Sequence, residues 1–595
     1  MVIRHSALPD DIPGQVQVLI SGGGPSGLFL ALDLAARGIA SLVIEPRDAV
    51  DPTRPRAKTT NARTMTHLRR LGLADALRAA APLAVDYAQD VIFCTGVAGP
   101  DAHELRRFRQ AFQLVPGRYD PQPECGQQVP QPVLEEVLRE AVAGSPLITL
   151  LTGWTVEAVD MSAADSAAAV TGRTPATVVV SDASGRTRSV TAGFVIGADG
   201  GSSAVRRSLG LRLEGGSAAL SNISILFRSK ELGSAMTLDP AVQYWVVGAD
   251  TAGMVGPMDL DDTWWAIVQG VDPRTAVRSD DAAAMVRSLV GAEIDVDVVA
   301  TDPWTARMLL APEYSRGSIF LVGDAAHLNP PWGGHGFNTC IGDAANLAWK
   351  LAAALQGWAG PGLMDSYGRE RRPVAERTIR DAAANGEALA YHFADPLLVA
   401  AGPDGEAARQ AAFEALAVKQ SEFDSLGLVL GYAYGGSPVV VPDGSPVPAE
   451  DPIRYVPAAS PGALLPHAWL ADGTSVYSRL GHGFTLLADA GTLDRVPAEH
   501  VFAPVLDAGA RQGIPVTVAA VGPSGDGTPP SELWGATAVL VRPDQHVAWR
   551  GSSAVAAAAA LAVAAGWTPQ SASAPASPDP QDQHERNTRV SAVIP

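Results

Sequence analysis

The stretch GSIFLVGDAAHLNPPWGGHGFNTCIGDAANLAWKL, residues 317–351, governs the interpretation of the whole chain. Its apolar run at 318–322 predicts a short buried strand, and Asp324 follows directly. A loop rich in proline and glycine comes next, and from about Ile341 apolar residues recur at helical spacing. This order of strand, acid, loop and helix brings backbone N–H groups and a helix N-terminus against a flat, electron-rich group.

A second glycine loop lies near the N-terminus. Gly22, Gly24 and Gly27 form the pattern GxGxxG directly after a strand-like run at 15–21. A helical pattern follows, and a second strand ends at Glu45, about twenty residues further on. The first glycine allows the tight turn, the second lets a pyrophosphate approach the backbone, and the third lets the helix pack on the sheet. Glu45 can accept hydrogen bonds from ribose hydroxyls, so the segment predicts a dinucleotide site.

A third segment of interest ends a buried strand at Asp199 and Gly200. Ser202 or Ser203 would cap the short helix that follows. Taken alone, this segment also fits an ordinary strand, turn and capped helix.

The region between the second and third segments, residues 216–300, is rich in strand-like runs with aromatic residues. The aromatic residues either line an apolar pocket for a flat substrate or simply pack in a core, and they include Tyr244, Trp245, Trp264 and Trp265. The sequence pattern fits both roles, a pocket lining and a packed core, for each of these aromatic residues.

Composition narrows the function classes. The net charge of −19 and a pI near 5.0 argue against nucleic acid or an anionic membrane as the main partner. No apolar run reaches the roughly 20 residues of a membrane span, and no secretory signal is recognised. The three cysteines, Cys94, Cys125 and Cys340, form no CxxC pair and no metal-ligand spacing. We therefore expect a cytoplasmic protein without a metal site.

A Pro/Gly-rich link precedes a separate C-terminal unit at 465–567. Its order of strands and helices resembles a thioredoxin fold, but it contains no cysteine, which excludes thiol redox chemistry in this unit. Residues 568–595 are rich in Ser, Pro, Gln and Asp and predict a disordered tail.

The three segments together resemble a known family, the single-component FAD-dependent aromatic hydroxylases. They match its fingerprints in chain order, namely the GxGxxG loop, Asp199-Gly200 with Arg206, and Gly323-Asp324 with the Pro/Gly loop. The C-terminal unit makes the chain similar to the phenol hydroxylase branch of this family, which is related to p-hydroxybenzoate hydroxylase. The implied fold is α/β, with a glutathione-reductase-like, FAD-binding Rossmann domain, an inserted β-sheet substrate domain and a C-terminal thioredoxin-like domain lacking CxxC.

This resemblance implies domain boundaries. The FAD-binding domain would comprise three parts, and the substrate domain two, before a helical segment, the C-terminal domain and the tail. The expected boundaries in chain order are 1–81 (FAD), 82–115 (substrate), 116–215 (FAD), 216–300 (substrate), 301–390 (FAD and helices), 391–464 (helical segment and linker), 465–567 (thioredoxin-like) and 568–595 (tail).

The resemblance also implies the cofactor-binding residues. The glycine loop would hold the pyrophosphate, Glu45 the adenosine ribose and Asp324 the ribityl chain, while the start of the last helix would face flavin N1 and C2=O. Arg56 would lie along the isoalloxazine entry and Gln131 would reach the ribityl or phosphate region. The complete implied set is Gly22, Gly24, Pro25, Ser26, Gly27, Glu45, Pro46, Arg47, Arg56, Gln131, Asp199, Gly200, Asp324, Pro331, Gly334, Gly336, Phe337 and Asn338.

The implied activity is hydroxylation of a phenolic or polycyclic aromatic substrate with NADPH or NADH and O₂, through a flavin C4a-hydroperoxide. The protein would expel water from the site and orient the ring. Expected partners are a small aromatic substrate and O₂, without nucleic acid or a membrane span, and a homodimer formed through or beside the C-terminal unit.

Two residues are candidates for a catalytic role. Pro331 lies where the family places a backbone carbonyl close to substrate and flavin. His335 departs from the family pattern, which has Gln or a similar residue there, and either acts as a base beside the flavin or fixes the loop by hydrogen bonding.

Two alternative functions remain open, and a third is disfavoured. Baeyer–Villiger oxygenation of an aromatic polyketide could use the same fold, and a non-catalytic FAD-binding module would retain the fold without turnover. A flavin halogenase is disfavoured because the WxWxIP-type signature and its lysine are not found.

Overall fold

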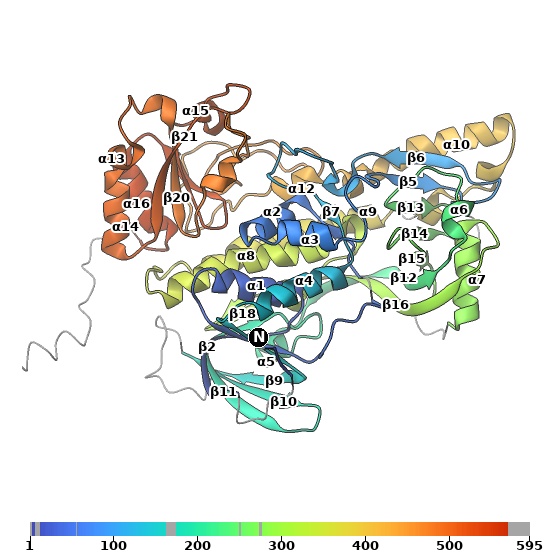
Figure 1. Cartoon of the computed structure of the whole chain (residues 1–595), viewed down its shortest axis with the longest axis horizontal. Coiled ribbons are helices and arrows are strands. Elements are labelled where there is room, and N and C mark those ends of the chain that lie inside the picture. The colour runs from blue at the N-terminus through green and yellow to red at the C-terminus, as the bar shows by residue number, and fades with distance from the viewer. Residues whose placement is uncertain are drawn as a thin grey trace, which may run out of the picture.

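The structure is a computed structural model that describes residues 3–5, 12–54, 56–161, 174–248, 251–272, 277–388 and 390–568. The predicted tail, apart from Thr568, lies outside these residues. Figure 1 shows an elongated molecule with the C-terminal unit at one end and an eight-stranded sheet at the other. A nine-stranded sheet and two long helices lie between them.

The nine-stranded sheet contains both predicted strands of the glycine-loop region. Parallel pairing joins β2 to β3 and to β11, and β11 also pairs with β18 of the 317–351 stretch. The two motif segments therefore end at the same edge of one sheet. Its strands in spatial order are β1 (Ile3–His5), β8 (Ile148–Thr152), β3 (Ser41–Glu45), β2 (Gln15–Ser21), β11 (Thr187–Gly197), β10 (Ala176–Asp182) and β9 (Trp154–Asp160), with β18 (Ile319–Leu321) and β17 (Ser315–Arg316) attached at β11.

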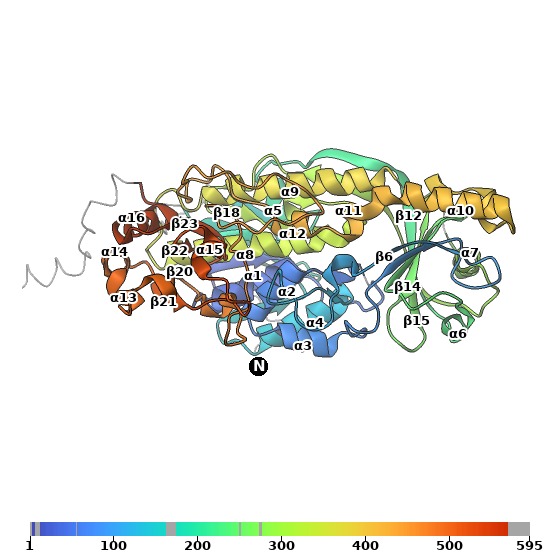
Figure 2. The same cartoon turned by 90° about the horizontal axis from the view of Figure 1, so that it is seen from above.

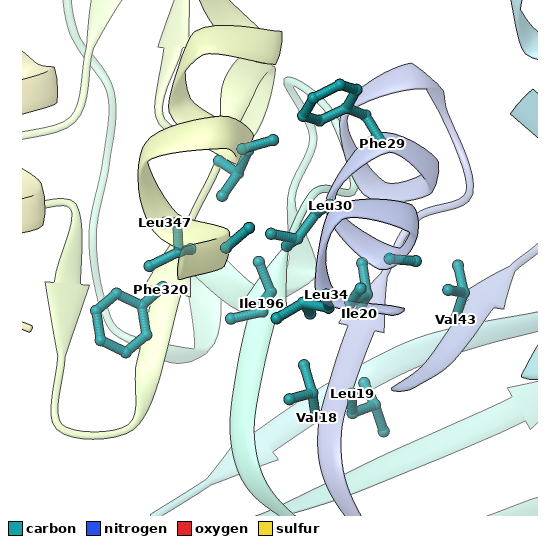
Figure 3. Close-up of a cluster of buried hydrophobic side chains, with 14 of the residues drawn as sticks. Val18, Leu19, Ile20, Phe29, Leu30, Leu34, Val43, Ile196, Phe320 and Leu347 are labelled. Carbon is teal, nitrogen blue, oxygen red and sulfur yellow. The ribbon is translucent and has the colours of Figure 1, made fainter. Parts of the chain in front are cut away.

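Helices α1 (Pro25–Ala35) and α8 (His335–Leu355) pack together over this sheet. Figure 3 shows Leu30 and Leu34 of α1 beside Leu347 of α8, above Ile20 and Ile196 of the central strands. All of these side chains are fully buried. Strands buried on both faces need continuous apolar runs, and that is what the sequence has at 18–20 and 194–196.

The prediction that the last helix begins near Ile341 was wrong by six residues, because α8 begins at His335. Apart from Phe337, its first two turns are small or polar, and His335, Asn338 and Cys340 are nevertheless buried there. Apolar periodicity fails where a helix buries polar side chains, which explains the error.

The second large sheet has eight strands and is fully antiparallel except for the β13–β5 pair. Helix α7 covers one of its faces, where Val286 and Leu289 pack on Ile223 and Phe227. Figure 2 shows the long strand β12 extending from this sheet toward the middle of the molecule. The order is β19 (His327–Leu328), β16 (Asp297–Leu310), β12 (Glu214–Arg228), β15 (Thr263–Gln269), β14 (Gly253–Pro257), β13 (Gln243–Val246), β5 (Val91–Cys94) and β6 (Glu104–Phe108).

The remaining elements connect and cover these sheets. A two-stranded ladder of β4 and β7 precedes helices α2 and α4 respectively. Their bounds are β4 (Thr59–Thr60), β7 (Gln127–Gln128), α2 (Ala62–Arg70), α3 (Ala74–Ala80), α4 (Gln131–Ala143), α5 (Ala204–Ser208), α6 (Leu232–Ala235), α7 (Ser279–Val290), α9 (Ser366–Gly386), α10 (Pro403–Ala415), α11 (Gln420–Phe423) and α12 (Leu426–Leu430). No helix in the described ranges is both long and apolar enough to cross a membrane.

The C-terminal unit has a four-stranded mixed sheet. β20 is parallel to β21 and antiparallel to β22, which pairs antiparallel with β23. The elements are β20 (Phe484–Asp489), α13 (Ala498–Val501), α14 (Ala503–Gln512), β21 (Val516–Val521), α15 (Pro530–Trp534), β22 (Ala538–Val541), β23 (Val547–Gly551) and α16 (Ala554–Ala564). Its likeness to thioredoxin stays a prediction.

The turn between β22 and β23 joins this unit to the rest of the chain through buried charges. Arg542 donates to both carboxylate oxygens of Glu370 on α9, at 2.6 and 2.8 Å, and pairs with Asp544. Arg63 of α2 donates to the Asp544 carbonyl at 2.8 Å and to the Gln545 side chain. All five residues are buried, so the C-terminal unit is held by an ionic network and not by contact alone.

Candidate active site

The carboxyl edge of the nine-stranded sheet and one face of the eight-stranded sheet enclose a single cavity of about 1060 Å³. Of the residues proposed from sequence, it brings together Gly22, Gly24, Pro25, Ser26, Glu45, Pro46, Arg47, Arg56, Gln131, Asp199, Gly200, Asp324, Pro331, Gly334, Gly336 and Phe337. Gly27, His335 and Asn338 do not line it.

The three glycines of the first loop have different surroundings. Gly22 has φ +105°, and a Cβ there would lie 2.3 Å from the Ala198 carbonyl oxygen. A Cβ on Gly27 would lie 2.0 Å from the Gly22 carbonyl oxygen, because this residue lets α1 pack against the loop. A Cβ on Gly24 would meet no protein atom within 4 Å. Only Gly24 therefore leaves free space, and that space belongs to the cavity.

Glu45 organises the wall beside this loop. Its Oε2 accepts a hydrogen bond from Gly23 N at 2.7 Å, and its Oε1 accepts from Arg47 Nε at 2.7 Å. Arg47 also pairs with Glu135 at 3.2 Å, and Gln131 donates to the other Glu135 oxygen at 3.0 Å. Burial opposes the charge of Arg47, but Glu45 and Glu135 raise its pKa. These bonds hold two carboxylates, Glu45 and Glu135, and one cation, Arg47, in fixed positions along the cavity edge.

Asp199 connects the second motif to α5. Its Oδ2 accepts from Ala204 N at 2.8 Å, whereas its buried Oδ1 has no partner among the described residues. Ser203 is the helix cap, since its hydroxyl accepts from Arg206 N at 2.9 Å. Arg206 donates to the carbonyls of Ala325 and Gly201, which ties this motif to the loop that carries Asp324.

Asp324 is exposed to the cavity, and the loop around it is braced from behind. Asp343 of α8 accepts from Gly323 N at 3.2 Å, from His327 Nε2 at 2.9 Å and from Arg371 Nε at 2.7 Å. Burial alone would raise the pKa of Asp343, but Arg371 and His327 hold it below its ordinary value. The hydrogen bonds of the buried Asp343 therefore fix the loop that carries the exposed Asp324.

The start of α8 forms the next part of the wall. Gly334 adopts a left-handed conformation, φ +67°, directly before the helix, and Gly336 and Phe337 face the cavity. The first N–H groups of a helix have no partner within the helix, so this 21-residue helix directs positive partial charge at the cavity. Asn338 lies behind, donating to the carbonyls of Gly334 and Thr59 and accepting from Asn61 N.

His335 is buried under the loop, with its ring beside Gly333, and is 4% exposed. Burial lowers its pKa to about 4, so the ring is neutral at neutral pH. Its Nε2 has no hydrogen-bond partner among the described residues. The structure thus places no imidazole atom of His335 at the cavity wall.

The eight-stranded sheet supplies an apolar and aromatic wall. Because side chains alternate along a strand, every second residue faces the cavity. The side chains on this face belong to Ser224 and Leu226 of β12, Gln243 and Trp245 of β13, Met254 of β14, Trp265 and Ile267 of β15, and Trp304 and Ala306 of β16, while the cavity is also lined at the intervening Ile225, Ala266 and Thr305. Alternation answers the open choice between pocket and core, since Trp265 lines the cavity while the adjacent Trp264 packs in the core on the opposite face, near Gly233 of α6.

Sequence reasoning missed several residues of the cavity wall. Lys58 and Thr59 precede α2, and Phe112 lies in a short segment where Gln110, Phe112 and Gln113 all have positive φ. Glu422 comes from α11, in the segment expected to be a helical linker. It forms an ion pair with Lys419, yet burial raises its pKa. Only Glu135 had a sequence signal, four residues after Gln131 on one helix face.

Arg56, which precedes α2, lines the cavity and is exposed, with φ +47°. Arg63 binds the C-terminal turn instead.

The residues present fit FAD. The empty space over Gly24, the unpartnered Asp199 Oδ1, the exposed Asp324 carboxylate and the two helix N-termini lie along one cavity. Helix N-termini suit a phosphate, and carboxylate oxygens suit the hydroxyl groups of a nucleotide.

The comparisons with known proteins agree with this geometry. The FAD binding domain family matches residues 15–382, and the aromatic-ring hydroxylase C-terminal family matches residues 458–569. The chain therefore belongs to the FAD-dependent aromatic-ring monooxygenases, which confirms the resemblance seen in the sequence, and its cofactor is FAD.

Individual relatives cover nearly the whole chain. A phenol 2-monooxygenase from a Pseudomonas species is 30% identical over 585 residues, covering 91% of both chains. Aklavinone 12-hydroxylase RdmE of Streptomyces purpurascens is 31% identical over 563 residues, covering 92% of this chain and 97% of the relative. The crystal structure of the flavin-dependent monooxygenase PieE with FAD and substrate superposes with a TM-score of 0.80 at 31% identity, over 93% of this chain and 99% of that one.

Proposed function

We propose that this protein hydroxylates a phenolic or polycyclic aromatic substrate, using FAD, O₂ and either NADH or NADPH. The observation that carries this proposal is the continuity of one cavity. The FAD cradle at one end opens into a chamber walled by Trp245, Trp265 and Trp304 at the other. A flat ring held against this wall would lie beside the cofactor's reactive edge. The named relatives that act on a phenol and on aklavinone support the same substrate class.

The chain's own residues would hold the cofactor as follows. The loop at Gly24 and the N-terminus of α1 would bind the pyrophosphate through backbone N–H groups. Glu45 retains acceptor capacity for ribose hydroxyls beyond its three bonds from Gly23 N and from the backbone and side chain of Arg47. Asp324 would accept from the ribityl hydroxyls, and Gly336 and Phe337 would place the α8 N-terminus at the pyrimidine edge.

FAD supplies the oxygen-transfer chemistry when it is reduced by the nicotinamide cofactor and meets O₂. The positive end of α8 would stabilise negative charge on the pyrimidine edge without a titratable group. The tryptophan wall would help to exclude water from the chamber once cofactor and substrate are bound. Pro331 lines the cavity beside the same loop, where its carbonyl would contact the substrate side of the ring.

The test is a screen of phenols and aromatic polyketides with the FAD-loaded protein. A substrate should accelerate NADH or NADPH oxidation and yield a product heavier by one oxygen atom. NMR of the product separates a new ring hydroxyl from Baeyer–Villiger insertion into a C–C bond. If oxidation of the nicotinamide cofactor yields only H₂O₂ with every compound, the hydroxylase proposal fails.

The proposal also includes the domain boundaries, the cellular location and the oligomeric state. The domain boundaries are those that the family resemblance implies. The free cysteines Cys94, Cys125 and Cys340 are buried thiols, which supports a reducing, cytoplasmic location. A homodimer through or beside the C-terminal unit can be tested by light scattering.

A further inference from the structure

Lys58 projects from the segment before β4 toward the aromatic wall of the chamber. Its Nζ lies 3.9 Å from the centre of the Trp265 ring and donates a hydrogen bond to the Arg56 carbonyl at 3.2 Å. The side chain is partly exposed, and it lines the cavity. Lys58 therefore spans from the cofactor half of the site to the substrate half.

This ammonium group lacks a negative partner. Among the described residues no carboxylate lies within ion-pair distance of Lys58 Nζ, and burial lowers its pKa to about 8 with no acid opposing the shift. Two other charged residues of the wall do have ionic partners. Arg54 pairs with Asp302 at 3.6 Å, and Glu422 pairs with Lys419. A protonated amine that lies over an aromatic ring and has no carboxylate partner favours an anion as its ligand.

The surroundings restrict what that anion can be. Trp245, Trp265 and Trp304 leave room for a flat apolar body on the sheet side. The ammonium can donate to an oxygen at the edge of such a body while the ring packs on the wall.

We infer that Lys58 binds the oxyanion of the aromatic substrate, either a phenolate or a ring carboxylate, and so selects substrates that are ionised when they bind. This inference rests on the proposed function and names the substrate class of the same site. A charge-assisted hydrogen bond in an enclosed site is roughly twice as strong as a neutral one, so the ionised form is favoured over its neutral ether. A phenolate ring is also more electron-rich than the phenol, which suits attack by an electrophilic oxygen.

Binding measurements on the FAD-loaded protein test this without requiring turnover. One set of probes is 2,4,6-trichlorophenol, its methyl ether and 2,4,6-trichlorobenzoate, and a larger set is 2-hydroxyanthraquinone, its methyl ether and anthraquinone-2-carboxylate. Each set keeps the ring and changes only the ionisable group. Affinities are measured by calorimetry near neutral pH for the wild type, Lys58→Met, Lys58→Arg and the surface control Lys230→Met.

Lys58→Met should weaken binding of the phenolate or the carboxylate by about tenfold or more and change binding of the methyl ethers by less than about twofold. Lys58→Arg should recover most of the loss, and Lys230→Met should behave as the wild type. The set member that loses affinity identifies phenolate or carboxylate as the source of the oxyanion.

Two results would overturn the inference. One is an equal loss for oxyanion and ether in Lys58→Met, and the other is a wild type that binds none of the oxyanions. Hydroxylation of neutral arenes by Lys58→Met with wild-type constants would likewise overturn it while leaving the proposed function intact. Oxyanion binding that depends on Lys58 but never leads to an oxygenated product would instead refute the proposed function alone.

Discussion

The two halves of the cavity are built in different ways. At the cofactor end, the wall is mostly backbone, formed by the loop at Gly22–Gly27, the turn at Gly334 and the N-termini of α1 and α8. At the substrate end, the wall is made of large side chains on one face of the eight-stranded sheet. Each half therefore depends on a different property of the sequence.

This difference determines which positions of the cavity wall tolerate amino-acid substitution. A backbone wall needs particular residues at fixed spacing, because a Cβ at Gly22 or Gly27 collides with the chain itself. A side-chain wall needs only alternation and bulk, so its chemistry can change from one substrate to another. Changes in the first half should affect FAD retention, and changes in the second should affect substrate binding and coupling.

The largest expected effect is at the glycine loop, where two alanine variants separate packing from cofactor approach. Gly27→Ala places Cβ 2.0 Å from the Gly22 carbonyl oxygen, so it should prevent the loop from forming and leave protein without FAD. Gly24→Ala meets no protein atom and should fold normally, yet lose about tenfold or more in FAD affinity because Cβ enters the pyrophosphate space.

Thermal unfolding of the apo-protein and FAD titration by fluorescence distinguish these two outcomes. A Gly24→Ala variant with wild-type FAD affinity would show that the space above this glycine is not used by the cofactor.

Asp324 gives the next largest effect in the same half. Asp324→Asn removes a charged acceptor exposed to the cavity, and the loss of a charge-assisted hydrogen bond costs about 1.5–3 kcal/mol, or roughly ten- to a hundredfold in FAD affinity. The unfolding midpoint of the apo-protein should stay unchanged. Asp261→Asn, an exposed residue outside the cavity, is the matched control. Equal FAD affinity for both variants would contradict the role of Asp324.

Adjacent tryptophans on β15 test the substrate half. Trp265→Leu should raise KM severalfold for the substrate identified in the screen and divert more reducing equivalents to H₂O₂, because water enters the chamber. Trp264→Leu removes a ring of the same size from the core on the opposite face. Both should cost about 2 kcal/mol of stability, but only the first should change KM. Equal KM changes would contradict the division of this sheet into a cavity face and a core face.

The same contrast explains how much the sequence revealed. GxGxxG, Glu45 and Asp324 could be found because backbone geometry fixes residue type and spacing there, and the strands at 15–21 and 41–45 are confirmed by β2 and β3. Trp265 could have been assigned from alternation with Trp264 once the strand register was known.

Other features could not be read from the chain. Lys58 and Glu422 reach the cavity only because segments distant in sequence meet in the fold. Neither residue belongs to a local sequence motif that would predict a position in the cavity wall. The ionic turn at Arg542 has the same origin, since Glu370 and Arg63 come from helices far upstream. The early start of α8 escaped detection because its first turns bury polar side chains.

His335 lies at the boundary of the two halves, and its burial makes a pH-dependent prediction. Its pKa falls from 6.5 to about 4 on folding, so between these values the unfolded chain binds a proton that the folded chain does not. Stability therefore rises with pH through this window. As the pH is lowered from neutrality to about 4, the wild type should lose up to about 3 kcal/mol more than His335→Gln. Urea unfolding of both proteins at the two pH values measures the difference, and identical pH dependence would contradict it.

The smallest expected effect is that of His335→Gln on turnover. The ring lies under the loop beside Gly333 and does not line the cavity, so neither ring nitrogen reaches a group bound there. Coupled turnover and the pH profile of kcat should stay within about twofold of the wild type. Replacement of Gly334, by contrast, strains a left-handed turn at the α8 N-terminus and should lower FAD affinity. If His335→Gln instead shifts the pH profile while FAD affinity is retained, the imidazole reaches the chamber during turnover, and the boundary between backbone wall and side-chain wall moves to include it.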